Sequence, residues 1–333
     1  MVDSIVRYQL PNGGWLKNQD WHKGVDVHEY DEAVRTGIGA TIDNKATWGE
    51  IRTLANEYAR HPEWSSQRQQ QVRHAVVMGL QYILSMPYEN GGFPQFYPPK
   101  SPQHYSRHIT FNDGAMTQVL RLLRDVGNRR PPFDALQLGS SLCDMAREAY
   151  KKGIDCILRC QVVKGGKRTV WCQQHDAETL QPVGARAYEL PSLSGAGETV
   201  DILRLLMEEE QPSAQMKEAV ESGVAWLRTH ALRGKRVETF QNAEGRQDKR
   251  LVDEPSAPLL WARFYDLEQE LPFFSDRTGQ LFRNFSDIQY ERRMGYAWFG
   301  TQPQSLLAEY EQWQKKNTPS SCDGKFQDAS LHR

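Results

Sequence analysis

The strongest constraint on the fold is a glycine pair that recurs along the first half of the chain. Gly13-Gly14, Gly91-Gly92 and Gly165-Gly166 each follow a segment in which apolar residues have helical spacing. Their first glycines lie 78 residues apart (13 to 91) and then 74 residues apart (91 to 165). This period is too long for the common solenoid repeats, but it suits two helices and a loop. The sequence therefore predicts repeated helix pairs with the glycine turns on one rim.

A second helix is expected to begin after each glycine turn. Apolar residues recur there at three- and four-residue steps, as in helices that pack one face on a core, over 46–59, 115–126 and 199–207. Long helices are also expected over 66–86, 141–160 and 214–230. These segments predict three antiparallel helix pairs wound around a centre, and hence an all-α-dominated fold. After about residue 234 short aromatic segments and turns predict an irregular, short-β region that lasts until a final helix at 305–314.

Composition excludes several classes of protein. The 333 residues carry a formal net charge of −1, without a polybasic tail, so we expect no nucleic-acid partner. No apolar run is long enough to span a bilayer, and the first residues form no signal peptide. We expect a single domain over 1–316, a monomer by default, and a disordered polar tail over 317–333.

Two similar polar turns precede predicted helices. Thr41-Ile42-Asp43-Asn44 and Thr110-Phe111-Asn112-Asp113 each combine a carboxylate with an amide. Such side chains often cap the first N–H groups of a helix, and capping is the simpler interpretation of either turn alone. Their oxygens are also the hard ligands that Ca²⁺ prefers. Because the repeat places both turns on the same rim, the pair favours a calcium site.

Basic residues form two further candidate groups. Arg186 lies in a loop that the repeat places on the same rim, although it could simply pair with Glu189 or Asp176 on the surface. Arginines interleaved with aromatic residues also follow in the irregular region, at 263, 277, 292 and 293. Guanidinium groups beside aromatic rings could bind carboxylated sugars, because the charge pairs with the acid and the ring stacks on the pyranose.

Together these motifs resemble the pectate lyases of polysaccharide lyase family ten. The resemblance extends to about residue 310 and rests on motifs at 12–18, 41–44, 94–98, 110–113, 169–175, 185–190, 192–195, 273–277 and 291–296. It implies an incomplete (α/α)3 toroid. It also implies calcium-dependent β-elimination of polygalacturonate by a secreted or periplasmic carbon–oxygen lyase, and a single catalytic domain over 1–316.

The resemblance also assigns roles to individual residues. Arg186 matches the catalytic base, and Asp43 and Asp113 match the essential calcium and substrate carboxylates, with Asn44 as a further calcium and substrate residue. Further substrate-binding residues are expected at Lys17, His108, His175, Arg263, Arg277, Arg293 and Tyr296. A free guanidinium has a pKa of about 12.5–13.8. Arg186 could therefore act as a base at alkaline pH or stay charged and stabilise the enolate.

Two other functions fit parts of the sequence. A glycoside hydrolase on a related toroid could use Asp43 and Asp113 as an inverting acid/base pair, without calcium. It would have no use for the arginines of the C-terminal region. A pectin-binding module could use the same arginines without catalysis, but binding alone does not require two acidic turns that face a basic loop.

Overall fold

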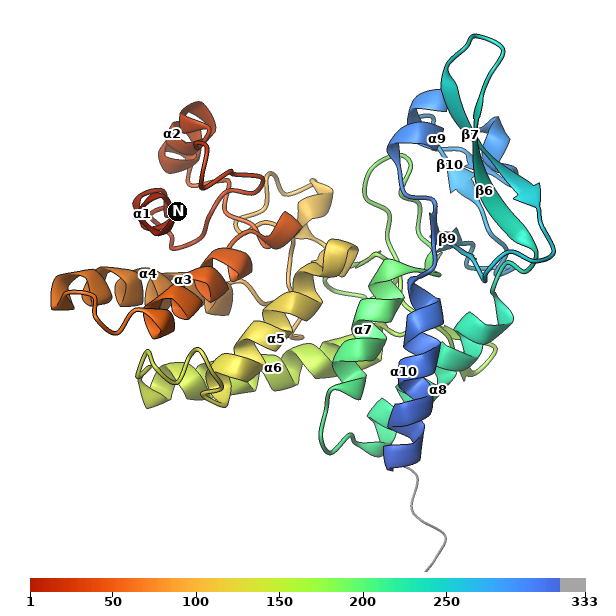
Figure 1. Cartoon of the computed structure of the whole chain (residues 1–333). Helices are drawn as coiled ribbons and strands as arrows, with labels where there is room; N and C mark the ends of the chain where they lie inside the picture. The colour runs from red at the N-terminus through yellow and green to blue at the C-terminus, as the bar shows by residue number, and fades with distance from the viewer. Residues whose placement is uncertain (318–333) are drawn as a thin grey trace, which may run out of the picture.

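A computed structural model describes residues 1–317 of the chain, and helices dominate it (Figure 1). The α-helices are α1 (Val2–Arg7), α2 (Val27–Thr36), α3 (Trp48–Arg60), α4 (Ser66–Ser85), α5 (Ala115–Gly127), α6 (Ser140–Cys160), α7 (Gly197–Met207), α8 (Ala214–Thr229), α9 (Tyr290–Gly295) and α10 (Gln302–Asn317). The predicted helices are confirmed to within a few residues, whereas α2 and α9 were not predicted. Except for Asn317, which ends α10, the predicted tail lies outside the described residues.

The longer helices pack in the order in which they follow one another along the chain. α3 packs against α4, α5 against α6, and α7 against α8. Neighbouring pairs also touch, since α5 contacts both α3 and α7, and α6 contacts both α4 and α8. The last helix, α10, returns to pack on α7 and α8. None of the helices within residues 1–317 has both the length and the apolar character needed to cross a membrane.

Glycines allow the two helices of each pair to approach closely. A Cβ added to Gly79 in α4 would lie 2.8 Å from the side chain of Ile51 in α3. Corresponding contacts join Gly153 in α6 with Leu120 in α5, and Gly223 in α8 with Leu203 in α7, at 2.3 Å and 2.9 Å. Such distances are shorter than any packed Cβ contact, so each long helix has a glycine where its partner's aliphatic side chain packs.

A buried aromatic side chain marks the same point of each repeat. Trp171 is fully buried, its Nε1 donates to the carbonyl of Ile157 in α6 at 2.7 Å, and its own carbonyl accepts from the N–H of Ser194 at 2.8 Å. The residue therefore joins the end of α6 to the segment that leads into α7. Fully buried aromatic residues hold equivalent positions at Trp15, Phe93 and Trp261.

The strands are short and form separate two-stranded sheets rather than a closed sheet within residues 1–317. The largest is a hairpin of β6 (Lys235–Gln241) and β7 (Gln247–Asp253). The two-residue pairs are β1 (Ile109–Thr110) with β4 (Gln174–His175), β2 (Val163–Lys164) with β3 (Lys167–Arg168), β5 (Leu193–Ser194) with β9 (Phe264–Tyr265), β8 (Trp261–Ala262) with β12 (Phe299–Gly300), and β10 (Phe274–Ser275) with β11 (Leu281–Phe282). The short-β region expected after residue 234 is therefore confirmed, although the long hairpin was not predicted.

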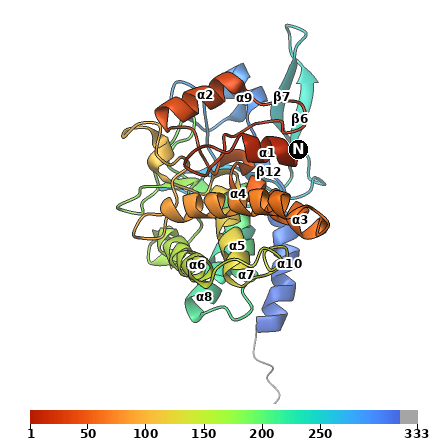
Figure 2. The same cartoon turned by 90° about the vertical axis from the view of Figure 1, so that its left-hand side faces the viewer.

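Figures 1 and 2 together show where the irregular segments lie. In both views α2, α9 and the β6–β7 hairpin lie on one side of the layer formed by the longer helices. The segments that lead into α3, α5 and α7 run along this same side. Loops that begin far apart in the sequence therefore meet on one face of the molecule.

Replacing Gly91 by alanine tests the packing of the glycine turns. Gly91 has φ +87°, and an added Cβ would lie 2.2 Å from the backbone oxygen of Lys152 in α6. We expect Gly91→Ala to lower the free energy of unfolding by about 3 kcal/mol or more, because both the backbone and its neighbour must shift. Urea denaturation followed by circular dichroism measures the loss.

Gly165→Ala is the matched control for this substitution. Gly165 has φ +54°, but an added Cβ there would meet nothing within 4 Å. The expected loss is about 1 kcal/mol, from the left-handed backbone conformation alone. Equal losses in the two variants would show that the contact with α6 is unimportant.

Candidate active site

Two short 3-10 turns present the acidic residues Asp43 and Asp113. They are η1 (Asp43–Lys45), before α3, and η3 (Asn112–Gly114), before α5, and the two turns contact each other. Each contains a left-handed residue, Asn44 at φ 49° and Asp113 at φ 50°. The Thr41 hydroxyl accepts from the N–H of Asp43 at 3.0 Å, but neither carboxylate caps η1, η3, α3 or α5. The capping interpretation is therefore wrong for Asp43 and Asp113, and the carboxylates are available for other partners.

Asp43 is almost completely buried beside a lysine. The residue is 4% exposed, and its Oδ2 accepts from Nζ of Lys17 at 2.6 Å. Its Oδ1 is buried without a hydrogen-bond partner. The neighbouring Asn44 donates its amide N–H to Oδ1 of Asn18 at 2.9 Å, which leaves its own amide oxygen for another ligand. A buried, unpartnered carboxylate oxygen is a position that a cation can occupy.

Asp113 is the more exposed acid, with 52% of its side chain accessible. Its Oδ2 accepts from the amide of Asn112 at 3.0 Å, and its Oδ1 lies 4.0 Å from Arg263. Partial burial raises the pKa of Asp113, and the nearby carboxylates of Glu198, Asp43 and Glu189 raise it further, although Arg263 opposes them. Positive charge near Asp113 would relieve this repulsion.

These side chains meet a simple chemical test for calcium. Within residues 1–317 no three acidic, histidine or cysteine side chains come together as a metal cluster. The neighbouring turns η1 and η3 instead offer two carboxylates, from Asp43 and Asp113, and Asn44 can add an amide oxygen. This donor set suits Ca²⁺, which accepts oxygen ligands in flexible geometry, provided that substrate or water completes the shell.

Arg263 is the central cation of the site. Its side chain is 13% exposed, and its Nη2 bonds to Oε1 of Glu198 at 2.6 Å and to Oδ1 of Asn112 at 3.0 Å. The aromatic ring of Tyr296 lies 4.8 Å from the guanidinium carbon. Burial would lower the pKa of Arg263, but the charges of Glu198 and Asp113 outweigh burial and raise it. Arg263 therefore stays charged and joins α7 to the turn that carries Asp113.

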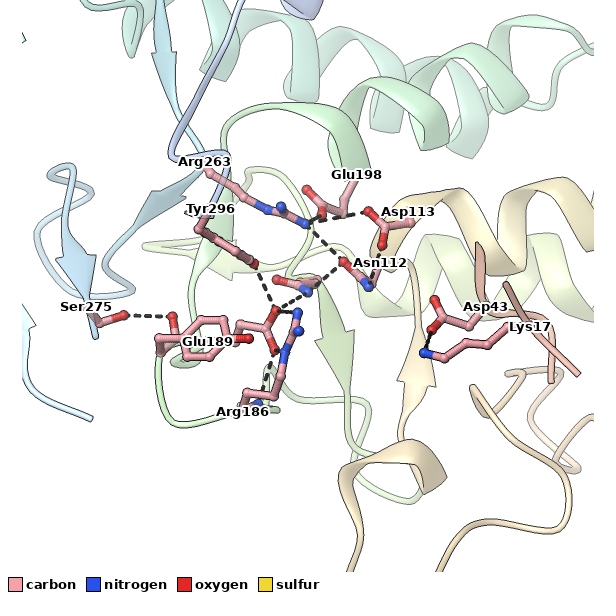
Figure 3. Close-up of polar contacts among 12 residues, drawn as sticks. Lys17, Asp43, Asn112, Asp113, Arg186, Glu189, Glu198, Arg263, Ser275 and Tyr296 are labelled. Atoms are coloured by element: carbon pink, nitrogen blue, oxygen red, sulfur yellow. Dashed lines mark hydrogen bonds and ion pairs between the residues drawn. The ribbon is translucent and has the colours of Figure 1, made fainter. Parts of the chain in front are cut away.

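Arg186 forms a two-point ion pair with Glu189 (Figure 3). Its Nε lies 2.7 Å from Oε2, and its Nη2 bonds to Oε1. Glu189 is thus the partner that was considered for Arg186. The pair does not lie on the open surface, however, because Glu189 is only 3% exposed. The hydrogen bonds that Arg186 donates to Glu189 raise the pKa of Arg186 above its already high ordinary value. The resting guanidinium is therefore firmly protonated.

The side-chain amides of Asn112 and Gln173 connect Asp113 with the Arg186–Glu189 pair. Gln173 donates to Oδ1 of Asn112 at 2.7 Å and to Oε1 of Glu189 at 3.3 Å. Tyr296 donates its hydroxyl to the same Glu189 oxygen at 2.9 Å. Asp113 and Arg186 are therefore connected through buried polar side chains, and Figure 3 shows this network with the Lys17–Asp43 pair beside it.

Arg277 also lies near this network. It is exposed, and it bonds to Glu291 of α9 through Nε at 3.1 Å and Nη2 at 3.0 Å. The ring of Tyr188 lies 6.0 Å from Arg277 and 4.8 Å from Arg186, so the two guanidinium groups share one aromatic neighbour. Arg277 is thus placed to meet a ligand that approaches Arg186.

Three of the predicted substrate-binding residues do not take part in this polar network. The prediction for His175 is wrong, because the ring is fully buried and hydrogen-bonds the N–H of Cys172 and the carbonyl of Leu180. Arg293 is committed to Asp248 of β7, at 2.6 and 2.7 Å, and to backbone carbonyls. His108 is half-buried, with no contact to the network, and burial together with Arg107 lowers its pKa.

Some important residues were not predicted to belong to the site. Glu198 lies at the third helix opening, the position that corresponds to Asp43 and Asp113 in the first two, so the repeat itself was a usable signal. Glu189 was considered only as a surface partner. The role of Gln173 depends on the pairing of β1 with β4, which no local pattern reveals.

A cavity of about 350 Å³ lies beside Asp113, lined by η3, the first residues of α7 and the segment that leads into α10. Its lining includes the acids Asp113, Glu198 and Asp201, against the single guanidinium of Arg263. This excess of carboxylates disfavours an anionic sugar there. An acidic ligand is better received near Arg186 and Arg277, which share the ring of Tyr188.

Comparisons with known proteins match most of the chain to one family. A family model described as pectic acid lyase matches residues 9–307. A variant of a family 10 polysaccharide lyase from Cellvibrio cellulosa, solved in complex with trigalacturonic acid, is 35% identical, with a TM-score of 0.79, over 93% of this chain and 91% of that one. A second structure of this lyase gives the same identity and TM-score over 93% and 90%. No curated protein matched the chain.

Removing the carboxylate of Glu198 tests the buried ion pair. We expect Glu198→Gln to lower the free energy of unfolding by about 3 kcal/mol, because Arg263 would stay buried without its acid. Glu309→Gln is the control, since its bidentate partner Arg204 is 31% exposed and such pairs contribute under about 1 kcal/mol. Urea denaturation compares the two, and equal losses would contradict the buried role of Glu198.

His175 should make stability depend on pH. Burial lowers the pKa of His175 from 6.5 to about 4, so the unfolded chain binds a proton first as the pH falls. The stability of the folded state is therefore lost progressively between about pH 6.5 and 4, by about 3 kcal/mol in total. His175→Gln should flatten the dependence seen in urea denaturation between these pH values.

The exposed His28 provides the control, as His28→Gln. This variant should keep the pH dependence of the unmodified chain. A His175→Gln variant that lost stability as steeply on acidification would rule out His175 as the source.

Proposed function

The chain belongs to the pectic acid lyase family and is a pectate lyase, and from this premise we propose that it cleaves polygalacturonate by calcium-dependent β-elimination. The observation that carries the proposal is the meeting of three groups on one face. These are the carboxylates Asp43 and Asp113, the Arg186 guanidinium (Figure 3), and Arg277, which shares the ring of Tyr188 with Arg186. A uronic acid chain presents one carboxylate per sugar, and this arrangement can bind such a carboxylate and hold a base near its C5.

Substrate binding follows from the positive groups. The trigalacturonic acid in the relative's structure supports an α-1,4-linked galacturonate substrate for this chain. Arg277 is exposed and can exchange its contact with Glu291 for a substrate carboxylate, at little cost. Lys17 can likewise contact the substrate once a cation replaces it at Asp43. Asn44 and Tyr296 adjoin these groups and can contribute hydrogen bonds to sugar hydroxyls.

The chemical difficulty is to remove a proton from C5, next to a carboxylate. Calcium held by Asp43, Asp113 and Asn44 would supply positive charge that neutralises the C6 carboxylate and acidifies this proton. Arg277 adds a second positive contact. The network of Asn112, Gln173 and Arg263 keeps Asp113 in place, so the acid does not have to reorganise during the reaction.

Proton transfer falls to Arg186. In its neutral form Arg186 accepts the C5 proton, the C–H electron pair forms the C4–C5 double bond, and the bond from C4 to the glycosidic oxygen breaks. The leaving sugar takes a proton from solvent. Because Glu189 raises the pKa of Arg186, the neutral form is scarce near neutrality, and the rate should rise with pH into the alkaline range.

The packing of α3 with α4, α5 with α6 and α7 with α8 supports an incomplete (α/α)3 toroid for the helical part. The family to which the chain belongs acts on a plant cell-wall polymer, which supports secretion or export to the periplasm. The enzyme family argues against the pectin-binding module and the glycoside hydrolase that the sequence had left open.

Polygalacturonate mixed with the protein should develop the ultraviolet absorbance of a 4,5-unsaturated product, and a calcium chelator should abolish it. The rate should still be rising above about pH 9.

Arg186→Ala should reduce kcat by about 10³-fold or more with the fold intact, as circular dichroism can verify. Asp43→Asn and Asp113→Asn should raise the calcium concentration needed for half-maximal activity.

Two outcomes would contradict the proposal. Saturated products from polygalacturonate would indicate hydrolysis. A bell-shaped profile centred near neutrality, or substantial turnover by Arg186→Ala, would remove Arg186 from the role of base.

A further inference from the structure

We infer that Glu189 is the positioning residue of the reaction, which holds the Nε and Nη2 edge of the Arg186 guanidinium so that Nη1 is presented to the substrate. The inference rests on the proposed role of Arg186 as the base. It extends that role to a second, buried residue that does not itself touch the substrate.

The carboxylate of Glu189 is held more firmly than an ordinary partner of arginine. It is 3% exposed, and each of its oxygens accepts several hydrogen bonds. Oε2 accepts from Nε of Arg186 at 2.7 Å and from the Arg186 backbone N–H at 3.1 Å. Oε1 accepts from Nη2 of Arg186, from the hydroxyl of Tyr296 at 2.9 Å and from the amide of Gln173 at 3.3 Å. Donors from three segments of the chain therefore fix this carboxylate in one orientation.

The guanidinium of Arg186 is fixed in consequence. Glu189 occupies its Nε and Nη2, whereas within the part of the chain that the structure describes Nη1 has no hydrogen-bond acceptor. The ring of Tyr188 lies 4.8 Å from the guanidinium carbon and limits rotation out of the plane. The Arg186 side chain is nevertheless 44% exposed. Nη1 is therefore the guanidinium nitrogen that Glu189 leaves unpaired, on a side chain that solvent and ligand can reach.

Glu189 has two opposing effects on a base at this position. Its negative charge stabilises the guanidinium that forms when Arg186 takes the proton, which makes neutral Arg186 a stronger base. The same charge makes the neutral form rarer at a given pH. Removing the charge should therefore move the rising part of the pH–rate profile to lower pH, and at the same time reduce the maximal rate.

Other groups around Arg186 cannot replace this effect. Several titratable or charged side chains face the guanidinium from the elements packed against it. They are Glu189 and Tyr188 of its own loop, Tyr105 of η2 (Tyr105–Arg107), Arg277, and Tyr296 after α9. Among these groups only Glu189 is a carboxylate, so it alone supplies a full negative charge at neutral pH.

The test is the pH–rate profile of Glu189→Gln on polygalacturonate at saturating calcium. We expect the midpoint of the rising limb to move to lower pH by about one unit or more, and maximal kcat to fall about tenfold or more. KM should stay within about twofold, because Glu189 does not touch the substrate. An unchanged midpoint together with an unchanged kcat would overturn the inference.

Glu32→Gln is the matched control. Glu32 bonds to Nε and Nη2 of Arg35 three residues away, in the geometry of the Arg186–Glu189 pair, but on the exposed surface of α2. The substitution removes the same charge from the protein. Its pH–rate profile should match that of the unmodified chain, and an equal shift would assign the effect to net charge and overturn the inference.

Glu189→Asp keeps the result interpretable if Glu189→Gln does not fold. Aspartate keeps the charge but is one methylene too short to hold both nitrogens, so the midpoint should stay within about half a unit while kcat falls several-fold. A kcat equal to that of the unmodified chain would overturn the positioning role.

A nuclear magnetic resonance measurement separates this inference from the proposed function. The Nε–H signal of Arg186, identified by its loss in Arg186→Lys, should be protected from exchange with water in the unmodified chain and lose that protection in Glu189→Gln. An inactive protein with a protected signal would contradict the proposed function but leave the ion pair standing. An unprotected signal in the unmodified chain would overturn the pairing itself.

Discussion

The architecture depends on one buried aromatic residue in each repeat. An indole N–H that donates to the last turns of one helix fixes the direction in which the chain leaves that helix. The carbonyl of the same kind of residue then receives the N–H of a segment that leads into another helix, as between Trp171 and Ser194. Since these contacts recur, the helix openings gather on one face. The acids Asp43, Asp113 and Glu198 meet there for this reason and not through any motif of their own.

The site that results is largely neutralised by its own side chains. Each cation that could bind an acidic sugar already has a carboxylate partner, in the pairs Lys17–Asp43, Arg186–Glu189, Arg263–Glu198 and Arg277–Glu291. Burial decides which pairs can open. Glu189 and Glu198 are almost inaccessible, so breaking their ion pairs would leave a buried charge without a partner. Arg277 and Glu291 are exposed, so water or a ligand can replace either partner at little cost.

The sequence predicted what local patterns encode and missed what distant contacts create. The helices were predictable because their apolar residues repeat at helical spacing, and the two acidic turns because they repeat each other. Trp261 was placed among the aromatic residues of the irregular region and not recognised as equivalent to Trp15 and Trp171, because its helix α10 begins 41 residues later, after short strands and turns. Likewise His175 was predicted to bind substrate because of the motif that contains it, but its β-pairing with Ile109 buries it in the core. Gln173 could be recognised only after that pairing was known.

The sequence separation of the contacts in the polar network has a consequence for folding. The two helices of a pair are close in the chain and can associate early, but the bond between Arg263 and Asn112 spans 151 residues, and that between Tyr296 and Glu189 spans 107. Loops of this length close slowly. The chain can therefore acquire most of its helical structure before it becomes a working enzyme, and mild denaturation can abolish turnover while the helical dichroism persists.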